Sequence, residues 1–294
     1  MEDRLMRADA ALAARGLAGS REKARVLIEL GLATVNGTVI KKPAQKVSGS
    51  DALAVLGEAH PYVSRGGLKL EKALRVFGVD ATGRVCMDIG ASTGGFTDVL
   101  LQSGARKVYA IDVGTGQLDE KLRRDPRVVC MERVNARALE AAMFDEAPTL
   151  AVMDVSFISI RLILPAALAI LGDQGHMVTL IKPQFEAGRA AIGKGGIVTS
   201  AKAHRDVLAA LTGFAPTLGW RVRALDVSPI TGGDGNVEFL ADLVPDDGAT
   251  VSVTEAEIER LVREAHGKGA QRSSESRDLQ ETDPGKGAAE SVRE

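Results

Sequence analysis

Four charged residues, Lys69, Asp154, Lys182 and Glu238, stand in short segments beside apolar runs, and the segments of Lys69, Lys182 and Glu238 carry Gly, Pro or Asn. Two lysines and two carboxylates in one site would suit the removal of a proton from a weakly acidic hydroxyl group. Desolvation and a second nearby lysine both make an ammonium easier to deprotonate, so that it can act as a base. The carboxylates would orient the lysines and balance their charge. We therefore predict a catalytic tetrad, with four ordinary surface charges as the alternative.

The segments that must position these residues alternate between strand-like and helix-like patterns. This alternation predicts an α/β fold with a doubly wound, mostly parallel, Rossmann-like sheet. In such sheets ligands bind beyond the carboxyl ends of the strands, where Asp88, Gly90, Asp112, Asp154 and Lys182 all fall. The expected strands are 85–89, 107–111, 128–131, 149–153, 177–181, 220–227 and 236–243. Helices are expected over 68–77 and from Phe96, and the clearest ones over 161–171 and 202–218.

A glycine-rich loop, Asp88-x-Gly90-x-x-x-Gly94-Gly95, follows the first of these strands and opens a helix. It lacks the Gly-x-Gly-x-x-Gly spacing of a dinucleotide site. Asp88 is placed to hold the ammonium of an amino acid, and Asp112 matches the acidic position that binds a ribose about 20 residues on. Adenosine joined to a cationic amino acid describes S-adenosylmethionine. With the tetrad, the loop predicts methyl transfer to a ribose 2′-hydroxyl of RNA; a merely structural turn is the alternative.

Residues 6–56 are predicted to form a small α+β module. Leu5, Leu12 and Leu17 indicate a short amphipathic helix, and Ser20 caps a second helix over 21–30 that ends at Gly31. Val35-Asn36-Gly37-Thr38-Val39 is typical of a hairpin with a two-residue turn, and Lys41, Lys42 and Lys46 are expected on the returning strand. Residues 1–72 hold 12 Lys/Arg against 8 Asp/Glu, although the whole chain has a net charge of −2. This basic end could bind RNA phosphates.

Composition excludes several other classes of protein. Aromatic residues make up only 3% of the chain, which argues against a carbohydrate site. The two cysteines, Cys86 and Cys130, lie in apolar stretches and are expected to be buried, reduced thiols, with no Cys-x-x-Cys pattern for a metal. The longest apolar stretch, 162–171, is shorter than the about 20 residues that span a bilayer. We expect a cytoplasmic chain with a disordered polar tail from about His266.

Most of residues 6–56 follow the pattern Arg7-x-Asp9-x-x-Leu12-x-x-Arg15-Gly16-Leu17-Ala18-x-Ser20-Arg21-x-x-Ala24-x-x-Leu27-Ile28-x-x-Gly31, followed by Val35-Asn36-Gly37. This pattern resembles an S4 domain, a small RNA-binding module. Further characteristic stretches are 62–70, 88–97, 112–118, 132–137, 154–159, 182–186 and 235–238. They are similar to those of the TlyA family, which joins an S4 domain to an FtsJ-like ribosomal RNA 2′-O-methyltransferase domain and is often labelled haemolysin.

The resemblance implies a role for each group of candidate residues. Lys69, Asp154, Lys182 and Glu238 would be the catalytic tetrad. S-adenosylmethionine would be bound by Asp88, Gly90, Ala91, Ser92, Thr93, Gly94, Gly95, Phe96, Asp112, Val113, Asn135 and Asp154. The RNA would be contacted by Arg7, Arg15, Ser20, Arg21, Lys23, Arg25, Asn36, Lys41, Lys42, Lys46 and Arg65.

The resemblance also implies cytidines of ribosomal RNA as substrates, in the small subunit, the large subunit or both. We expect an RNA-binding domain at 1–58, a linker and first helix at 59–82, the methyltransferase domain at 83–246, and a helical end with a polar tail at 247–294. The partners would be ribosomal RNA or ribosomal subunits. We expect the protein to be a monomer with no stable membrane association. A membrane-active haemolysin and a non-catalytic RNA-binding protein remain the alternatives.

Overall fold

The computed structural model describes residues 5–29, 31–55, 60–232, 235–248 and 253–267. Two units make up the fold, one from residues 1–72 and 80–134 and the other from residues 73–79 and 135–294. The first unit contains a small N-terminal module and three strands of a larger sheet, and the second contains the remaining four strands of that sheet.

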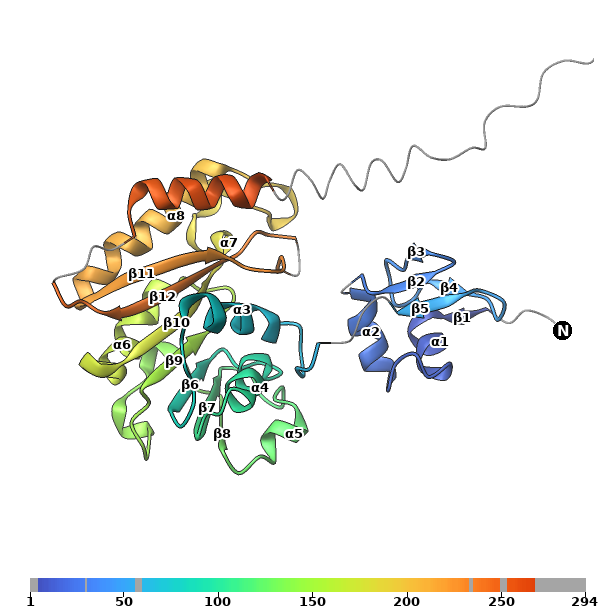
Figure 1. Cartoon of the computed structure of the whole chain (residues 1–294), viewed down its shortest axis with the longest axis horizontal. Helices are drawn as coiled ribbons and strands as arrows, with labels where there is room; N and C mark the ends of the chain where they lie inside the picture. Colours follow the sequence, from blue (N-terminus) through green and yellow to red (C-terminus); the bar gives the residue numbers. More distant parts are fainter. Residues whose placement is uncertain (1–4, 30, 56–59, 233–234, 249–252, 268–294) are drawn as a thin grey trace, which may run out of the picture. The chain divides into compact units, whose positions relative to one another are not determined.

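The N-terminal module places two helices on one face of short strands (Figure 1). Its core is made of small and branched apolar side chains such as Ala8, Leu12, Leu27, Ile28 and Ile40. The strands pair as β1–β4 and as β3–β2–β5. The elements are β1 (Met6–Arg7), α1 (Ala8–Ala14), α2 (Arg21–Glu29), β2 (Ala33–Val35), β3 (Thr38–Val39), β4 (Lys46–Val47) and β5 (Leu53–Val55).

The structure confirms the helix cap, the helix end and the turn that were predicted for this module. The Ser20 hydroxyl accepts a hydrogen bond of 3.1 Å from the backbone N–H of Lys23, as an N-cap should. Gly31 follows α2 with a positive φ of 70°. Asn36 and Gly37 both have positive φ, 50° and 79°, which suits the two-residue turn between β2 and β3.

Two expectations for the module are wrong. Leu5 and Leu17 do not join the apolar face of α1, since they are 60% and 37% exposed. The chain before α1 is a strand that pairs with β4, so the helix begins only at Ala8. Lys41 and Lys42 lie beyond the end of β3, and Lys46 lies in β4, which pairs with β1 in a different sheet. The three lysines therefore do not share a returning strand.

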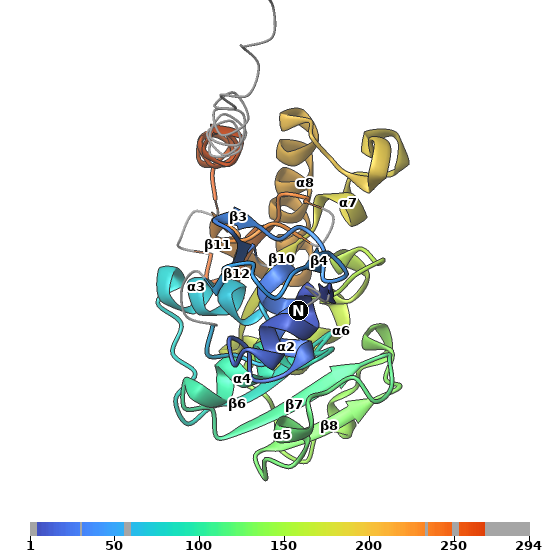
Figure 2. The same cartoon turned by 90° about the vertical axis from the view of Figure 1, so that its right-hand side faces the viewer.

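A seven-stranded sheet in the order β11-β12-β10-β9-β6-β7-β8 confirms the predicted α/β class. Pairing is parallel for β6–β7, β7–β8 and β9–β10 and antiparallel for β10–β12 and β11–β12. Figure 2 shows β6, β7 and β8 side by side. The strands are β6 (Val85–Ile89), β7 (Lys107–Asp112), β8 (Val128–Glu132), β9 (Leu150–Met153), β10 (His176–Ile181), β11 (Trp220–Val227) and β12 (Phe239–Pro245).

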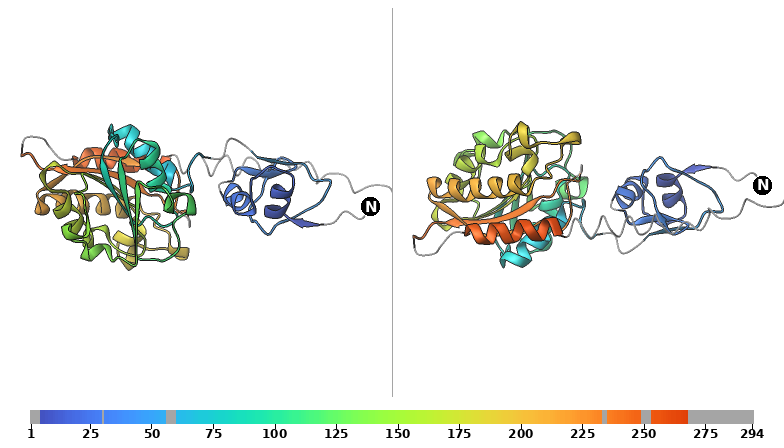
Figure 3. Two further views of the ribbon diagram at one scale, coloured as in Figure 1. Left: turned by 90° about the horizontal axis from the view of Figure 1, so that it is seen from below. Right: turned by 90° about the horizontal axis from the view of Figure 1, so that it is seen from above.

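Helices lie on both sides of these strands, and a helix over residues 255–267 runs alongside α8 (Figure 3). The side chains of β6 are all buried, as its unbroken apolar run predicts for a strand covered on both faces. The α-helices are α3 (Gly67–Phe77), α4 (Gly95–Gln102), α5 (Glu120–Arg123), α6 (Leu164–Leu171), α7 (Pro183–Glu186) and α8 (Ala201–Phe214). The 3-10 helices are η1 (Ala136–Ala138), η2 (Ala141–Met143), η3 (Ile160–Leu162), η4 (Gly172–Gln174), η5 (Arg189–Ala191), η6 (Lys194–Gly196) and η7 (Ala215–Leu218).

Several details differ from the sequence-based expectation. The last strand begins at Phe239, so Glu238 lies just before it and not within it. Cys86 is buried as expected, whereas Cys130 is only partly buried on the edge strand β8. Within the described ranges, no helix has the length and apolar character that crossing a bilayer requires. The predicted disorder from about His266 concerns mostly residues 268–294, which lie outside the described residues; His266 itself lies in the helix over 255–267.

Candidate active site

An ion pair joins two of the predicted catalytic residues, Asp154 and Lys182. Asp154 follows β9 and Lys182 follows β10, and these strands are parallel neighbours, so their carboxyl ends meet at one edge of the sheet. Nζ of Lys182 lies 2.6 Å from Oδ1 of Asp154 and donates a hydrogen bond of 2.8 Å to Oγ of Ser156. The two charged side chains are only 11% and 19% exposed. Solvent therefore screens their attraction less than it would at an open surface.

Glu238 is held in a tight loop ahead of β12 and is only 2% exposed. A Cβ on Gly232 would lie 2.6 Å from Oε1 of this carboxylate, so a side chain at Gly232 would displace the carboxylate of Glu238. The loop is anchored by Asn236, whose Oδ1 accepts a hydrogen bond from the backbone N–H of Val198 and whose Nδ2 donates to the carbonyl of Gly196. The motif around Glu238 thus shapes the loop as well as carrying the acid.

Lys69 lies in the first turn of α3, as predicted, and is 7% exposed. The segment before it packs closely, because a Cβ on Gly67 would lie 2.6 Å from the Tyr62 ring and a Cβ on Gly95 would meet Oγ of Ser64. Glycine is therefore required at position 67, and a side chain at Gly95 would displace the Ser64 hydroxyl. The lysine is consequently fixed on a segment that packs against the start of α4, the helix that follows the glycine-rich loop.

The glycine-rich loop after β6 packs closely against other parts of the protein. Gly90 and Gly94 have positive φ values of 84° and 95°. A side chain at Gly94 would overlap Leu122. Asp88 is fully buried in β6, and its Oδ2 accepts a hydrogen bond of 2.7 Å from the Thr97 hydroxyl in α4. Asp88 thereby ties the strand to the helix that the loop opens.

Asp112 links the loops that follow β6 and β7. Its Oδ2 accepts from the backbone N–H of Ser92 at 2.8 Å, and its Oδ1 accepts from that of Gly114 at 2.7 Å. Each carboxylate oxygen has a further lone pair, so both can still accept from hydroxyl groups. The neighbouring Val113 is 76% exposed, which leaves an apolar surface beside the acid. This pairing of an acceptor with an apolar surface suits a nucleoside.

The structure adds Phe157 to the candidates, a residue that sequence reasoning did not select. Its side chain is 91% exposed, and its φ of 64° lies in the left-handed region that bulky residues avoid. The ring packs on Phe185 with 5.1 Å between centroids. Phe157 follows Asp154 closely, and Phe185 follows Lys182 closely, so this exposed aromatic lies on the loop of the ion pair. The sequence did contain a signal for Phe157, because an aromatic residue next to a predicted catalytic motif is unusual in a chain with few aromatic residues.

Comparison with known proteins identifies the family. The profile of the FtsJ-like methyltransferases matches residues 62–243, and that of the S4 domain matches residues 6–53. The chain belongs to the FtsJ-like methyltransferase family. It is 44% identical to the 16S/23S rRNA (cytidine-2′-O)-methyltransferase TlyA of Mycobacterium tuberculosis, over 80% of this chain and 88% of that protein. The predicted resemblance to TlyA proteins is thereby confirmed.

Two further relatives carry haemolysin names. Hemolysin A of Brachyspira hyodysenteriae is 44% identical over 81% of this chain and all of that protein. The solved structure of a Streptococcus thermophilus protein described as a candidate haemolysin is 47% identical and superimposes with a TM-score of 0.74, over 92% of this chain and 98% of that one. Relatives of this chain therefore carry both methyltransferase and haemolysin names.

Several predicted RNA contacts of this S4-bearing methyltransferase are occupied in holding the module together. Arg7 binds Asp9 through two hydrogen bonds of 3.0 and 2.8 Å, and Arg21 lies 3.4 Å from the same carboxylate. Arg7 holds the pKa of Asp9 to about 2. Arg15 donates to three backbone carbonyls, and Asn36 bonds Asp51. Ser20 caps α2. The other candidates are at least partly exposed, with Arg65 half-buried and Lys23, Arg25, Lys41, Lys42 and Lys46 exposed.

The remaining residues that were predicted to bind the cofactor differ in their solvent exposure. Ser92 and Thr93 are exposed, while Ala91 and Phe96 are buried, so the Phe96 side chain belongs to the core. Asn135 caps η1 by accepting a hydrogen bond of 3.1 Å from the backbone N–H of Arg137.

Proposed function

We propose that this FtsJ-like methyltransferase transfers a methyl group to the 2′-hydroxyl of a cytidine in ribosomal RNA of the small subunit, the large subunit or both. The observation that carries the proposal is the sheltered Lys182–Asp154 ion pair at the carboxyl ends of two parallel strands. The TlyA proteins of Mycobacterium tuberculosis and Campylobacter jejuni, named as cytidine-2′-O-methyltransferases, supply the substrate class.

S-adenosylmethionine fits the residues around the glycine-rich loop. Both oxygens of Asp112 can accept from ribose hydroxyls, and exposed Val113 offers an apolar surface to adenine. Gly90, which has a positive φ, lets the backbone approach a ligand closely, whereas Gly94 makes room for Leu122. Asp88 supplies a negative charge near this loop, although its carboxylate is buried and bonded to Thr97. When bound, S-adenosylmethionine supplies an electrophilic methyl group.

The proposed tetrad prepares the hydroxyl nucleophile. Lys182 is the principal proton-accepting group, and Asp154 fixes its position and balances its charge. Lys69 and Glu238, each almost fully buried, complete the set as the second lysine and the second carboxylate. Asp154 and Lys182 directly follow β9 and β10, and Glu238 directly precedes β12, strands that belong to one sheet, whereas Lys69 lies in α3. Holding the hydroxyl in a fixed orientation lowers the entropic cost of the transfer.

The N-terminal domain, proposed to span residues 1–58, would supply RNA affinity. Its exposed Lys23, Arg25, Lys41, Lys42 and Lys46 can contact phosphates, which position RNA without reading its sequence. Arg65, in the linker and first helix at 59–82, would extend this surface. The exposed ring of Phe157 can stack on a base turned out of the RNA, because such stacking is available to any base.

The proposal includes a monomer that acts on ribosomal RNA in the cytoplasm, with the catalytic domain at 83–246 and an end segment at 247–294. Ribose methylation should be mapped on both ribosomal RNAs from cells with and without the gene. Loss of methylation at one or more cytidines in the deletion strain, restored by the wild-type chain and not by Lys182→Ala, would support it. An unchanged map would refute it.

A further inference from the structure

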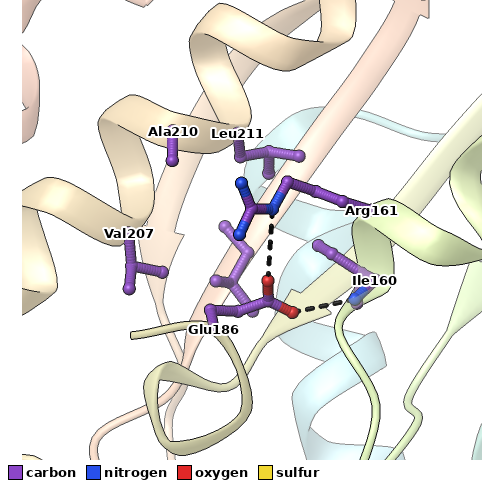
Figure 4. A pocket seen from close by; sticks show the side chains of 7 residues that line it. Ile160, Arg161, Glu186, Val207, Ala210 and Leu211 are labelled. Carbon is purple, nitrogen blue, oxygen red and sulfur yellow. Dashed lines mark hydrogen bonds and ion pairs between the residues drawn. The ribbon is translucent and has the colours of Figure 1, made fainter. Parts of the chain in front are cut away.

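Glu186, the last residue of α7, lies between residues 159–161 and helix α8. Its Oε2 accepts a hydrogen bond of 2.7 Å from the Ser159 hydroxyl, and its Oε1 accepts one of 2.8 Å from the backbone N–H of Ile160. Arg161 approaches to 3.6 Å. Figure 4 shows the carboxylate between Arg161 and the Ile160 backbone, beside Val207 and Leu211 of α8. The Glu186 side chain is only 5% exposed.

The space around this carboxylate is too small for a ligand. The adjoining cavity has a volume of about 10 Å³ and is lined mainly by apolar side chains, including Ile181, Val207, Ala210 and Leu211. Such a volume holds at most about one water molecule. A buried carboxylate is costly unless its oxygens are hydrogen-bonded. The two donors and the nearby guanidinium offset this cost, so the protein itself supplies the partners of Glu186.

These bonds close a series of contacts between the segments that follow β9 and β10. Lys182 binds Asp154 and Ser156, Phe185 packs on Phe157, and Glu186 binds Ser159 and Ile160. Contact partners therefore follow the same order along both segments. Glu186 occupies the far end, where it also receives the first N–H of η3, a group that has no acceptor within the helix.

The strained backbone of Phe157 lies between the two ends of this series. A φ of 64° is unfavourable for phenylalanine and persists only where surrounding contacts impose it. Asp154 and Ser156 are held on one side by Lys182, and Ser159 and Ile160 are held on the other by Glu186. Release of either end would let the loop relax toward an ordinary conformation. The exposed ring would then lose its contact with Phe185.

We propose that Glu186 is a positioning residue that clamps the 154–160 loop and so sets the placement of Phe157 and of the Lys182–Asp154 pair for methyl transfer. The role in transfer rests on the proposed function; the clamp itself does not. Because Glu186 acts through the loop, its loss should lower turnover and leave the binding of S-adenosylmethionine unchanged.

The test compares Glu186→Ala, Glu186→Gln and Ser159→Ala in the full-length protein. Glutamine can keep both contacts, since its carbonyl accepts from Ile160 and its amide donates to the Ser159 hydroxyl. Alanine removes both. Ser159→Ala, for use should Glu186→Ala fold poorly, removes one of them together with the hydrogen bond that the Ser159 hydroxyl accepts from the backbone N–H of Arg161. Glu259→Ala is the matched control, because that acid also pairs with arginine but is 42% exposed on another helix.

Two measurements decide the outcome. With ribosomal subunits from cells that lack the gene as substrate, Glu186→Ala should lower kcat by about tenfold to a hundredfold, as expected for a misplacement near 1 Å. Glu186→Gln and Glu259→Ala should stay within about threefold of wild type, and the Kd for S-adenosylmethionine should stay unchanged in all variants. Hydrogen–deuterium exchange of residues 154–162 should accelerate in Glu186→Ala and, less strongly, in Ser159→Ala.

Exchange in Glu186→Ala that matches the wild type would overturn the clamp, whatever the activity. Faster exchange with unchanged kcat would overturn its role in positioning. Equal loss of kcat in Glu186→Gln and Glu186→Ala, with exchange preserved in the glutamine variant, would also overturn it, since the charge itself would then be needed. Failure of the wild-type protein to methylate the subunits would refute the proposed function alone, because exchange still reports on the clamp.

Discussion

Nζ of Lys182 lies 2.6 Å from Oδ1 of Asp154, and each residue directly follows one of two parallel, adjacent strands. The placement results from strand order, since the carboxyl ends of parallel neighbours must meet. The same lysine also donates a hydrogen bond to Ser156, so two residues of one loop hold its ammonium group. Such an arrangement fixes the direction in which the Lys182 ammonium points.

Lys182→Ala should abolish methyl transfer while S-adenosylmethionine still binds. Loss of a general base or acid typically lowers the rate by roughly 100- to 10,000-fold. Single-turnover assays and calorimetry would measure the two quantities. Lys202→Ala is the control, because Lys202 also lies 2.6 Å from an aspartate, Asp206, but is 74% exposed. Near-normal turnover of Lys182→Ala would exclude it as the proton-accepting group.

Asp88→Asn should weaken S-adenosylmethionine binding by about tenfold to a hundredfold, the loss expected when a charged hydrogen-bond partner is removed. Asparagine retains the volume of the buried side chain and can still accept from Thr97. Thr97→Val is the companion variant, because it removes the hydroxyl and keeps the charge. Calorimetry that gives equal affinities for Asp88→Asn and wild type would remove Asp88 from the cofactor site.

Lys41→Ala and Lys42→Ala should each weaken binding to ribosomal RNA. Each lost phosphate contact should flatten the dependence of log K on log salt concentration by about one unit. Affinity measured at several salt concentrations, with Arg263→Ala as an exposed control on the 255–267 helix, would test this. An unaltered slope in both lysine variants would place the RNA-binding surface elsewhere.

Acidification should destabilise the protein through His204. Burial, aided by His266, lowers the pKa of His204 from 6.5 to about 4. Its Nε2 donates to the carbonyl of Val198 at 3.1 Å, and its Nδ1 accepts from His266 at 3.1 Å. Between these pKa values the unfolded chain binds a proton that the folded chain does not. The contribution of His204 to the free energy of unfolding is therefore complete above pH 6.5 and declines as the pH falls toward 4.

The decline should reach at most about 1.4 kcal/mol per pH unit. Urea unfolding at several pH values would measure it, and His204→Asn should flatten the slope in this window. A variant with the wild-type slope would assign the acid sensitivity to other groups.

The sequence alone was sufficient for features that depend on adjacent residues. The unbroken apolar run of β6, the Asn36-Gly37 turn and the Ser20 cap are each specified by side chains within a few positions. The order of strands and helices follows from the same patterns. The four tetrad candidates were selected because each stands beside such an element, and the structure places Asp154 and Lys182 directly after strands.

Only the tertiary structure decided which groups each polar side chain contacts. Arg15 and Lys41 look alike in sequence, but Arg15 is bound to three carbonyls contributed by a distant loop, and Lys41 is exposed. The positive φ of Phe157 and the clamp by Glu186 likewise have no local signal. Both depend on contacts between segments that the sheet brings together, and the energy of such contacts is set by register and loop geometry, which residue types along the chain do not encode locally.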